Sequence, residues 1–285
     1  MPNLAPTAGT LLRTWRQRRR MSQLELALEA EVSQRHLSFL ESGRSAPSRD
    51  MILHLAERLA IPLRERNILL VAAGFAPVYQ ERSLDDPALT AQRAAIEVVL
   101  KGHEPFPALA VDRHWTLVAA NAAIGRLIAG IDAKLLEPPL NVLRLSLHPD
   151  GLAPRIANYA EWKAHVITRL TQQVDASADA KLNELLEELK AYPRPRGGPG
   201  TTPAQKRDFG NVVVPLQLMT PDGVLSFFST TTVFGTPVDI TLAEIAIEAF
   251  YPADKATAEA MRKPAAAGPP APSASGKPPK RRGGR

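Results

Sequence analysis

Four polar side chains close together in the sequence have the chemistry needed to read DNA bases. They are Ser33, Gln34, Arg35 and Ser38. A glutamine amide can form two hydrogen bonds with adenine, and an arginine guanidinium can form two with guanine. If Leu37 and Leu40 face the interior of a helix, these four polar side chains face outward. The spacing therefore predicts a helix that presents base-reading groups to the major groove of double-stranded DNA.

Three further residues are candidates for contacts with the phosphate backbone. Gln23 begins the preceding predicted helix, where an amide donor adjoins the positive end of the helix. Arg44 and Arg49 follow the base-reading helix and can donate to phosphate oxygens. Ser22 and Glu25 form the pattern of a capping box at the start of the first helix. Two short helices joined by a tight turn predict a helix-turn-helix, whose second helix enters the major groove.

The elements that must position these groups are short helices that together cover residues 8–74. Apolar residues recur at intervals of three and four, most clearly over 52–59. Gly43 suits the left-handed residue that ends a helix. A linker and a connecting helix, over 75–104, are predicted to follow.

The chain from Leu11 to Ala73 resembles the Cro/C1-type helix-turn-helix, also called the xenobiotic-response-element family. The matching motifs are Ser22-Gln23-x-x-Leu26-Ala27, Val32-Ser33-x-x-x-Leu37 and Leu40-Glu41-x-Gly43-Arg44-x-x-Pro47-Ser48. The resemblance implies five helices, operator DNA bound as a homodimer, and bases read from the start of the third helix. One position departs from the pattern: the family usually has Gly in the turn where this chain has Glu31.

The larger second domain, predicted over 105–256, combines strands with helices. Strand-like runs at 108–111 and 115–118 flank a polar turn, and a late hairpin at 212–234 follows a Pro- and Gly-rich loop at 193–210. Helices are predicted at 122–129, 153–174 and 179–191. Another is predicted to begin at a Thr241–Glu244 capping box and to run to about Phe250. The fold class is therefore α+β, a five-helix domain followed by a PAS-like antiparallel sheet flanked by helices.

Several strings along the chain resemble MmyB-like transcription regulators. They are Pro62-Leu-Arg-Glu-Arg-Asn67, Ala72-Ala-Gly-Phe-Ala-Pro77, Asn141-Val-Leu-Arg144, Leu147-His-Pro-Asp-Gly-Leu152, Phe234-Gly-Thr-Pro237 and Tyr251-Pro-Ala-Asp254. The resemblance implies a PAS-like domain that accepts a fatty-acid-like molecule and follows the helix-turn-helix. It extends to about Arg262.

An apolar ligand would need an apolar cavity and a polar anchor. Candidate wall residues are Leu109, Val111, Trp115, Leu117, Leu216, Leu218, Phe227 and Phe228. Candidate ligand-binding polar or aromatic residues are Arg113, Trp115, Asn121, Arg144, His148, Asn158 and Trp162. For each, the alternative is an ordinary core residue or a structural hydrogen-bonding residue.

Charge is unevenly distributed along the 285 residues, whose net charge is +6. Residues 1–66 hold eleven arginines and seven acidic residues, whereas residues 67–262 hold 18 basic and 22 acidic residues. The tail from 263 to 285, predicted to be disordered, holds six basic residues and no acidic ones. A basic segment that precedes a mildly acidic one favours a polyanion-binding module joined to a second domain.

Composition and motifs also exclude several classes of protein. Cysteine is absent, which excludes disulfides and thiolate metal sites and fits a cytoplasmic protein. No apolar run is long enough for a membrane span, and the sequence contains no HExxH, P-loop, GxSxG or dinucleotide fingerprint. We therefore expect no enzyme, metal or cofactor, but a homodimeric DNA-binding regulator modulated by a small apolar ligand. The alternative is a C-terminal domain that binds another protein and no small ligand.

Overall fold

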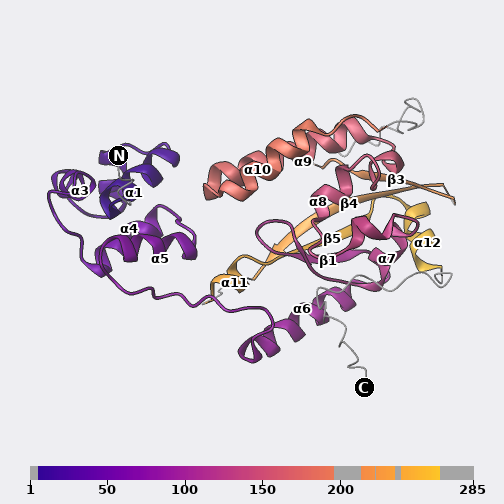
Figure 1. The fold of residues 1–285 in the computed structure, drawn as a ribbon, viewed down its shortest axis with the longest axis horizontal. Helices are drawn as coiled ribbons and strands as arrows, with labels where there is room; N and C mark the ends of the chain where they lie inside the picture. The colour runs from indigo at the N-terminus through magenta and orange to yellow at the C-terminus, as the bar shows by residue number, and fades with distance from the viewer. Residues whose placement is uncertain (1–5, 196–212, 222, 235–238, 264–285) are drawn as a thin grey trace, which may run out of the picture. The chain divides into compact units, whose positions relative to one another are not determined.

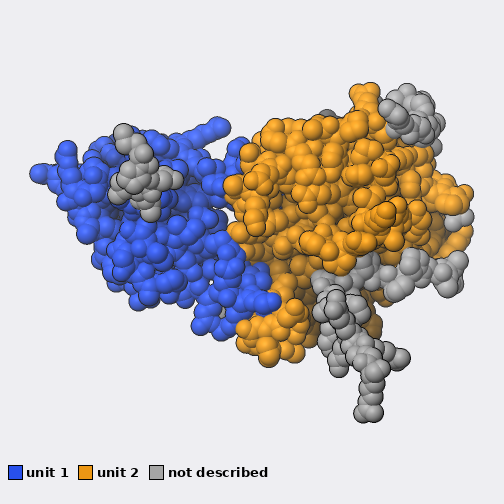
Figure 2. Space-filling view, viewed as in Figure 1, with its two compact units in different colours: residues 1–83, 173–178, 236–243 blue, residues 84–172, 179–235, 244–285 orange. Residues whose placement is uncertain are grey.

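The computed structural model describes residues 6–195, 213–221, 223–234 and 239–263. The chain divides into two compact units (Figure 2). The first comprises residues 1–83, 173–178 and 236–243, and the second comprises the remainder. Most of the loop predicted at 193–210, and the tail predicted at 263–285 apart from its first residue, lie outside the described residues. Within the described residues, no helix has the length and apolar character needed to cross a bilayer.

Five helices form the N-terminal part of the first unit, as the sequence predicts. They are α1 (Ala8–Arg18), α2 (Gln23–Glu29), α3 (Gln34–Glu41), α4 (Arg49–Arg58) and α5 (Leu63–Ala72). Hydroxyl side chains cap four of them, because each accepts a hydrogen bond from a free backbone N–H in the first turn. The capping box between Ser22 and Glu25 is present with both of its hydrogen bonds.

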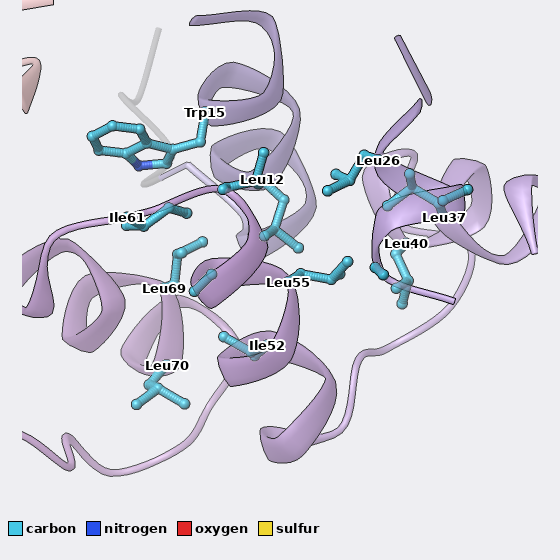
Figure 3. Close-up of a cluster of buried hydrophobic side chains, with 14 residues drawn as sticks. Leu12, Trp15, Leu26, Leu37, Leu40, Ile52, Leu55, Ile61, Leu69 and Leu70 are labelled. Carbon is cyan, nitrogen blue, oxygen red and sulfur yellow. The ribbon is translucent and has the colours of Figure 1, made fainter. Parts of the chain in front are cut away.

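One apolar core joins these five helices (Figure 3). Leu12 of α1, Leu37 of α3 and Leu55 of α4 are each completely buried, and Leu70 of α5 is buried with them. Burial of such a side chain contributes about 1.5–3 kcal/mol, so these contacts dominate the stability of the bundle. The core therefore fixes which face of α3 points inward and leaves its polar face outside.

The second unit is built on an antiparallel sheet of five strands (Figure 1). The strands are β1 (Ala108–Val111), β2 (Leu117–Ala120), β3 (Leu216–Thr220), β4 (Gly223–Val233) and β5 (Ala246–Pro252). Their order across the sheet is β2-β1-β5-β4-β3. The last strand in the sequence therefore occupies the centre, paired with β1 on one side and β4 on the other.

The helix predicted from Thr241 to about Phe250 is wrong. A short helix, α11 (Ile240–Ala243), occupies the start of that segment, and β5 begins at Ala246. Asp239 caps α11 by accepting a hydrogen bond from the backbone N–H of Thr241, at 2.9 Å. Ladder hydrogen bonds to strands on both sides outweigh the local helix signal, as tertiary pairing commonly does.

Helices pack around the sheet, and their bounds differ in places from the prediction. They are α6 (Thr90–Gly102), α7 (Ala122–Ile128), α8 (Val142–Leu147), α9 (Tyr159–Ser177), α10 (Ala180–Ala191) and α12 (Lys255–Arg262). Three short 3₁₀ segments accompany them: η1 (Pro87–Leu89), η2 (Ala133–Leu136) and η3 (Ala153–Arg155). The long helix begins at Tyr159 rather than at 153, because 153–155 form η3. The helices α8 and α12 were not predicted.

Candidate nucleic-acid interface and ligand cavity

The start of α3 carries the predicted base-reading side chains on its outer surface. Ser33, Gln34 and Arg35 are exposed, and Ser38 is half-buried, whereas Leu37 is completely buried. The hydroxyl of Ser33 caps the helix by accepting from the N–H of His36 at 3.1 Å, and its own proton stays free to donate. The arrangement leaves hydroxyl, amide and guanidinium groups free to meet a partner.

Two arginines meet at one aromatic ring on this surface. The guanidinium of Arg35 lies 5.3 Å from the ring centroid of Phe39, and that of Arg44 lies 5.8 Å from it. Neither arginine forms an ion pair with a carboxylate among the described residues, and the same holds for exposed Arg49. Cations held against a ring face but not neutralised are suited to contact phosphate or base acceptors.

A buried ion pair ties α1 to the end of α3. Arg16 donates from Nε and Nη2 to the two oxygens of Glu41, at 2.6 and 2.8 Å, and from Nη1 to the carbonyl of Met21 at 2.7 Å. Burial opposes ionisation of Glu41, but hydrogen bonds from Arg16 and Gln23, with the positive charge of Arg16, hold its pKa below the usual value. The pair therefore fixes the orientation of α3 against α1.

Gln23, predicted to contact phosphate, takes part in this network. Its amide nitrogen donates to Glu41 at 2.8 Å, and the side chain is half-buried. One amide hydrogen and the amide oxygen remain for other partners. The phosphate contact of Gln23 thus stays a prediction, and only the remaining amide hydrogen can donate to a phosphate.

The turn between α2 and α3 has the left-handed backbone that the resemblance implies. Glu31 has φ of 53°, a conformation that favours glycine, and its side chain is exposed. Backbone hydrogen bonds close the turn, from the N–H of Glu31 to Leu28 and from that of Val32 to Ala27. The departure from the family pattern therefore leaves the turn geometry intact, at a cost of about 1 kcal/mol.

In the second unit, an apolar cavity of about 100 Å³ lies between the sheet and helices α7, α8 and α9. The strands contribute Leu109, Leu117, Leu216, Glu248 and Phe250, and helix α9 contributes Trp162, His165, Val166 and Arg169. Leu127, Leu143 and Leu145 are among the apolar side chains that α7 and α8 add. An apolar hollow with a few polar groups at one side is typical of a small-molecule site.

The polar side of the cavity is an ion pair across α9 and β5, in which Glu248 is buried and Arg169 is partly exposed. Arg169 donates from Nη2 to Glu248 Oε1 at 2.5 Å and from Nη1 to Oε2 at 3.2 Å. The hydroxyl of Thr231 donates to Glu248 Oε1 at 2.6 Å and accepts from Arg169. The guanidinium also lies 4.6 Å from the ring centroid of Trp115. Both oxygens of Glu248 are therefore engaged, and the charge of Arg169 is paired with that carboxylate.

Trp115 reaches the cavity from a strained turn. Its φ is 65°, a left-handed conformation that is a marked outlier for so bulky a residue. Asp112 holds the turn by accepting hydrogen bonds from the backbone N–H groups of His114 and Thr116, each at 2.8 Å. The strand predicted at 115–118 accordingly begins only at Leu117. Strain of this kind, of order 1–3 kcal/mol, often marks a functional site.

His165 is the polar cavity residue whose ring nitrogens have no hydrogen-bond partner among the described residues. Burial lowers its pKa, and the nearby charge of Arg169 lowers it further, while Glu248 acts in the opposite direction. A neutral imidazole follows at neutral pH, with one donor and one acceptor nitrogen. Trp162, by contrast, donates its indole N–H to the hydroxyl of Ser146 at 2.9 Å.

Two of the seven predicted ligand-binding residues, Trp115 and Trp162, line the cavity. The cationic candidates among the others are paired with carboxylates away from it. Arg144 makes a bidentate contact with Glu188, and Arg113 lies 3.4 Å from Asp179. Neither arginine is among the cavity-lining residues, because each is held by an acidic partner on another element.

The remaining three candidates make structural contacts outside the cavity lining. Asn121 accepts from the N–H of Ala108 and donates to two backbone carbonyls, and Asn158 donates to the carbonyl of Pro215. His148 accepts from the N–H of Asp150 through Nδ1. These contacts match the alternative given in the sequence analysis, in which each candidate is a structural hydrogen-bonding residue.

Half of the predicted wall residues line the cavity: Leu109, Trp115, Leu117 and Leu216. Val111, Leu218 and Phe227 are buried in the core without reaching it. Phe228 stacks on Tyr251 instead, with ring centroids 5.4 Å apart.

Sequence reasoning missed Arg169, Glu248 and His165. A usable signal existed for α9, where positions 162, 165, 166 and 169 share one face of the helix. No such signal exists for Glu248, because the local sequence pattern predicts a helix over its segment.

Comparison with known families accounts for both units. A model of the MmyB-like transcription regulator ligand binding domain matches residues 92–263. The chain belongs to this family. A helix-turn-helix model matches residues 12–66, which include the whole of α2 and α3. No curated protein matches the sequence. The two matches confirm both resemblances and the α+β fold class, and they establish a DNA-binding transcription regulator.

Proposed function

We propose that the protein is a sequence-specific regulator that binds operator DNA as a homodimer and changes its DNA affinity when a small apolar molecule occupies the cavity. Sequence-specific DNA binding is supported by the exposed polar side chains at the start of α3, where Arg35 forms no ion pair with a carboxylate among the described residues. Ser33, Gln34 and Arg35 project from a helix whose other face is locked in the core. Base discrimination needs side chains that are held in place and yet free to bond.

A homodimer is proposed because a single recognition helix reads only a few base pairs. Two copies related by a two-fold axis would place their recognition helices about 34 Å apart, in successive major grooves. Sedimentation analysis of the purified chain, with and without a two-half-site duplex, tests this directly. A monomer on DNA would contradict the proposal.

The ligand part rests on the apolar cavity between α9 and the sheet. A ligand shifts DNA affinity only if it binds the DNA-competent and the incompetent arrangements with different strength. The fatty-acid-like ligand that the family resemblance implies would place its chain among the leucines of this cavity. Native mass spectrometry of the protein purified from cells would detect a retained molecule.

The test of the DNA-reading proposal is a gel-shift titration on the DNA upstream of the protein's own gene and on scrambled DNA, at about 0.15 M salt. Arg35→Ala is expected to lose about 1–3 kcal/mol of discrimination at one base pair. Arg58→Ala is the matched control, since it removes the same charge from an exposed position in the last turn of α4. Equal binding of both DNAs by the unaltered protein would refute sequence-specific regulation, and an equal loss on all sequences would place Arg35 on phosphate.

A different outcome would favour the alternative function of the second unit. If no small molecule is retained or bound, the sheet domain is better explained as a surface for another protein. The DNA-reading proposal would survive that result, because the gel-shift titration does not depend on the cavity.

A further inference from the structure

One large aromatic side chain of the helix-turn-helix lies outside the apolar core. Phe39 belongs to α3, and it is half-buried. It is not among the described side chains that form the core of the five helices or pack against it. A half-exposed ring forgoes part of the stabilisation that full burial would give. The position of this ring is therefore better explained by the groups that it contacts.

Two guanidinium groups meet the Phe39 ring from different parts of the chain. Arg35 lies one helical turn earlier, and its Cζ is 5.3 Å from the ring centroid. Arg44 comes from the loop after α3, and its Cζ is 5.8 Å from the same centroid. Both distances lie within the ~6 Å over which a cation is attracted to the negative face of an aromatic ring. The ring therefore attracts two cations that would otherwise repel each other.

The backbone of the loop also holds Arg44 at this ring. The carbonyl of Phe39 accepts hydrogen bonds from the N–H of Arg44, at 2.9 Å, and from that of Ser45, at 3.2 Å. The hydroxyl of Ser42 donates to the same carbonyl at 3.3 Å. Gly43, with φ of 73°, lets the chain turn back toward α3. One residue therefore holds both the main chain and the guanidinium of Arg44.

Contact with the ring leaves the hydrogen-bond donors of each arginine available. In the part of the chain that the structure describes, neither guanidinium donates to another residue or pairs with a carboxylate. The N–H donors of a guanidinium lie in its plane, so stacking on a ring face does not use them. An arginine that moves freely loses side-chain entropy when it binds DNA, and this loss weakens binding. An arginine that is already held against a ring loses less.

We propose that Phe39 is a positioning residue for DNA recognition, whose ring holds Arg35 and Arg44 with their N–H donors ready to meet DNA. The inference rests on the proposed DNA-reading function and deepens it, because it assigns the residue that orders two of the predicted contact side chains. A cation–ring attraction at an exposed site corresponds to about two- to fivefold in a binding constant. For the two arginines together, the effect is about five- to thirtyfold.

The test is a gel-shift titration of full-length Phe39→Leu and Phe39→Tyr proteins on the DNA upstream of the protein's own gene. Leucine keeps an apolar side chain without a ring face, whereas tyrosine keeps the ring. We expect the leucine variant to bind about five- to thirtyfold more weakly, and the tyrosine variant to stay within about twofold of the unaltered protein. Phe106→Leu is the matched control, because its ring lies 5.8 Å from Cζ of Arg262 in the second unit, and we expect no change. Equal affinities of the leucine and tyrosine variants would overturn the proposal.

A further comparison shows whether the ring acts through the two arginines. In a protein in which Arg35 and Arg44 are both replaced by alanine, Phe39→Leu should change DNA affinity by less than about twofold, because the contacts that it removes are already absent. Both backgrounds are measured at about 0.05 M salt, where the weakened protein still binds. An equally large loss in both backgrounds would overturn the proposal and indicate direct contact of the ring with DNA, for instance with a thymine methyl group.

Pentafluorophenylalanine at position 39 keeps the shape of the ring and makes its face positive, so it decides the inference if Phe39→Leu does not fold. We expect it to weaken binding at least as much as leucine, and an unchanged affinity would overturn the proposal. Failure of the proposed function is a different result. If the unaltered protein bound upstream and scrambled DNA equally, sequence-specific regulation would be refuted, and the difference between the leucine and tyrosine variants, measured on either DNA, would still decide the role of Phe39.

Discussion

Replacing Glu41 with alanine is expected to lower the free energy of unfolding of the helix-turn-helix by about 3–5 kcal/mol, the range found when one partner of a buried ion pair is removed. The side chains of Arg16 and Glu41 are only 9% and 2% exposed, so water cannot replace the lost carboxylate. Arg16 would keep a single partner, the carbonyl of Met21, and the amide of Gln23 would lose its acceptor. Since whole domains are stable by only about 5–15 kcal/mol, the loss is large.

Hydrogen exchange followed by mass spectrometry on the full chain measures this loss locally. Amides in α1 and α3 should exchange faster by a factor of about 10² to 4 × 10³, since each 1.4 kcal/mol corresponds to a tenfold change. Glu81→Ala is the control, because Glu81 pairs with Arg64 at an exposed site. Exposed pairs contribute about 0–1 kcal/mol. Similar effects of the two substitutions would refute the argument that burial makes the Glu41 pair different.

A double variant distinguishes the effect of the unpaired charge from the effect of lost side-chain packing. The double variant Arg16→Met with Glu41→Leu replaces both charges by apolar groups of similar volume, and such swaps are often neutral or stabilising. We therefore expect it to be more stable than Glu41→Ala alone. A double variant as unstable as the single one would show that packing, not the unpaired charge, determines the effect.

The same pair predicts an acid dependence. The pKa of Glu41 is lower in the folded protein than its usual value of 4.5, so its ionised form contributes stability above that pH. This contribution should disappear as the pH falls from about 4.5 through the folded-state pKa. Urea unfolding at several acidic pH values checks the slope, which should be shallower in Glu41→Ala.

Three other predictions follow from single positions or segments. Glu31→Gly should stabilise the helix-turn-helix by about 1 kcal/mol, because it relieves the left-handed backbone; urea midpoints measure this, and a lower midpoint would count against it. Gly9→Ala should destabilise the protein by about 1–3 kcal/mol, because an added Cβ would collide with the carbonyl of Leu40. Gly102→Ala has open space around it and should stabilise the protein by up to about 1 kcal/mol. Thermal melts that rank the two variants in reverse order would contradict the packing argument. Residues 263–285 carry six basic and no acidic residues. Deleting them should make the slope of log binding constant against log salt concentration shallower by about 0.9 for each cation that contacts a phosphate. An unchanged slope would show that the tail makes no such contact.

The helix-turn-helix was predictable because its signals are local. Ser22 with Glu25 marks one helix start, and Gly43, with φ of 73°, sits in the left-handed conformation that ends α3. Burial of Leu37 and Leu40 follows from their spacing, and the exposure of Arg35 follows in turn. Each inference needs only neighbours within about one helical turn.

The polar side of the cavity was not predictable in the same way. Arg169 and Glu248 lie 79 positions apart, and only the completed sheet brings them together. The arginines singled out from the sequence, Arg113 and Arg144, had the right chemistry but are held by acidic partners that spacing alone could not reveal. Identification of this site required knowing that the segment after α11 is a strand, and that depends on long-range pairing.

The central position of β5 has a consequence for biosynthesis. Ala249 pairs with Ala108, and this contact must wait until the ribosome has added more than a hundred further residues. The five N-terminal helices need no such distant partner, and domains generally fold as units during synthesis, with the N-terminal one first. A message truncated before codon 246 would thus yield a polypeptide that keeps the helix-turn-helix but lacks the strand that carries Glu248. Without β5, the sheet would be left as two separate hairpins, β1 with β2 and β3 with β4.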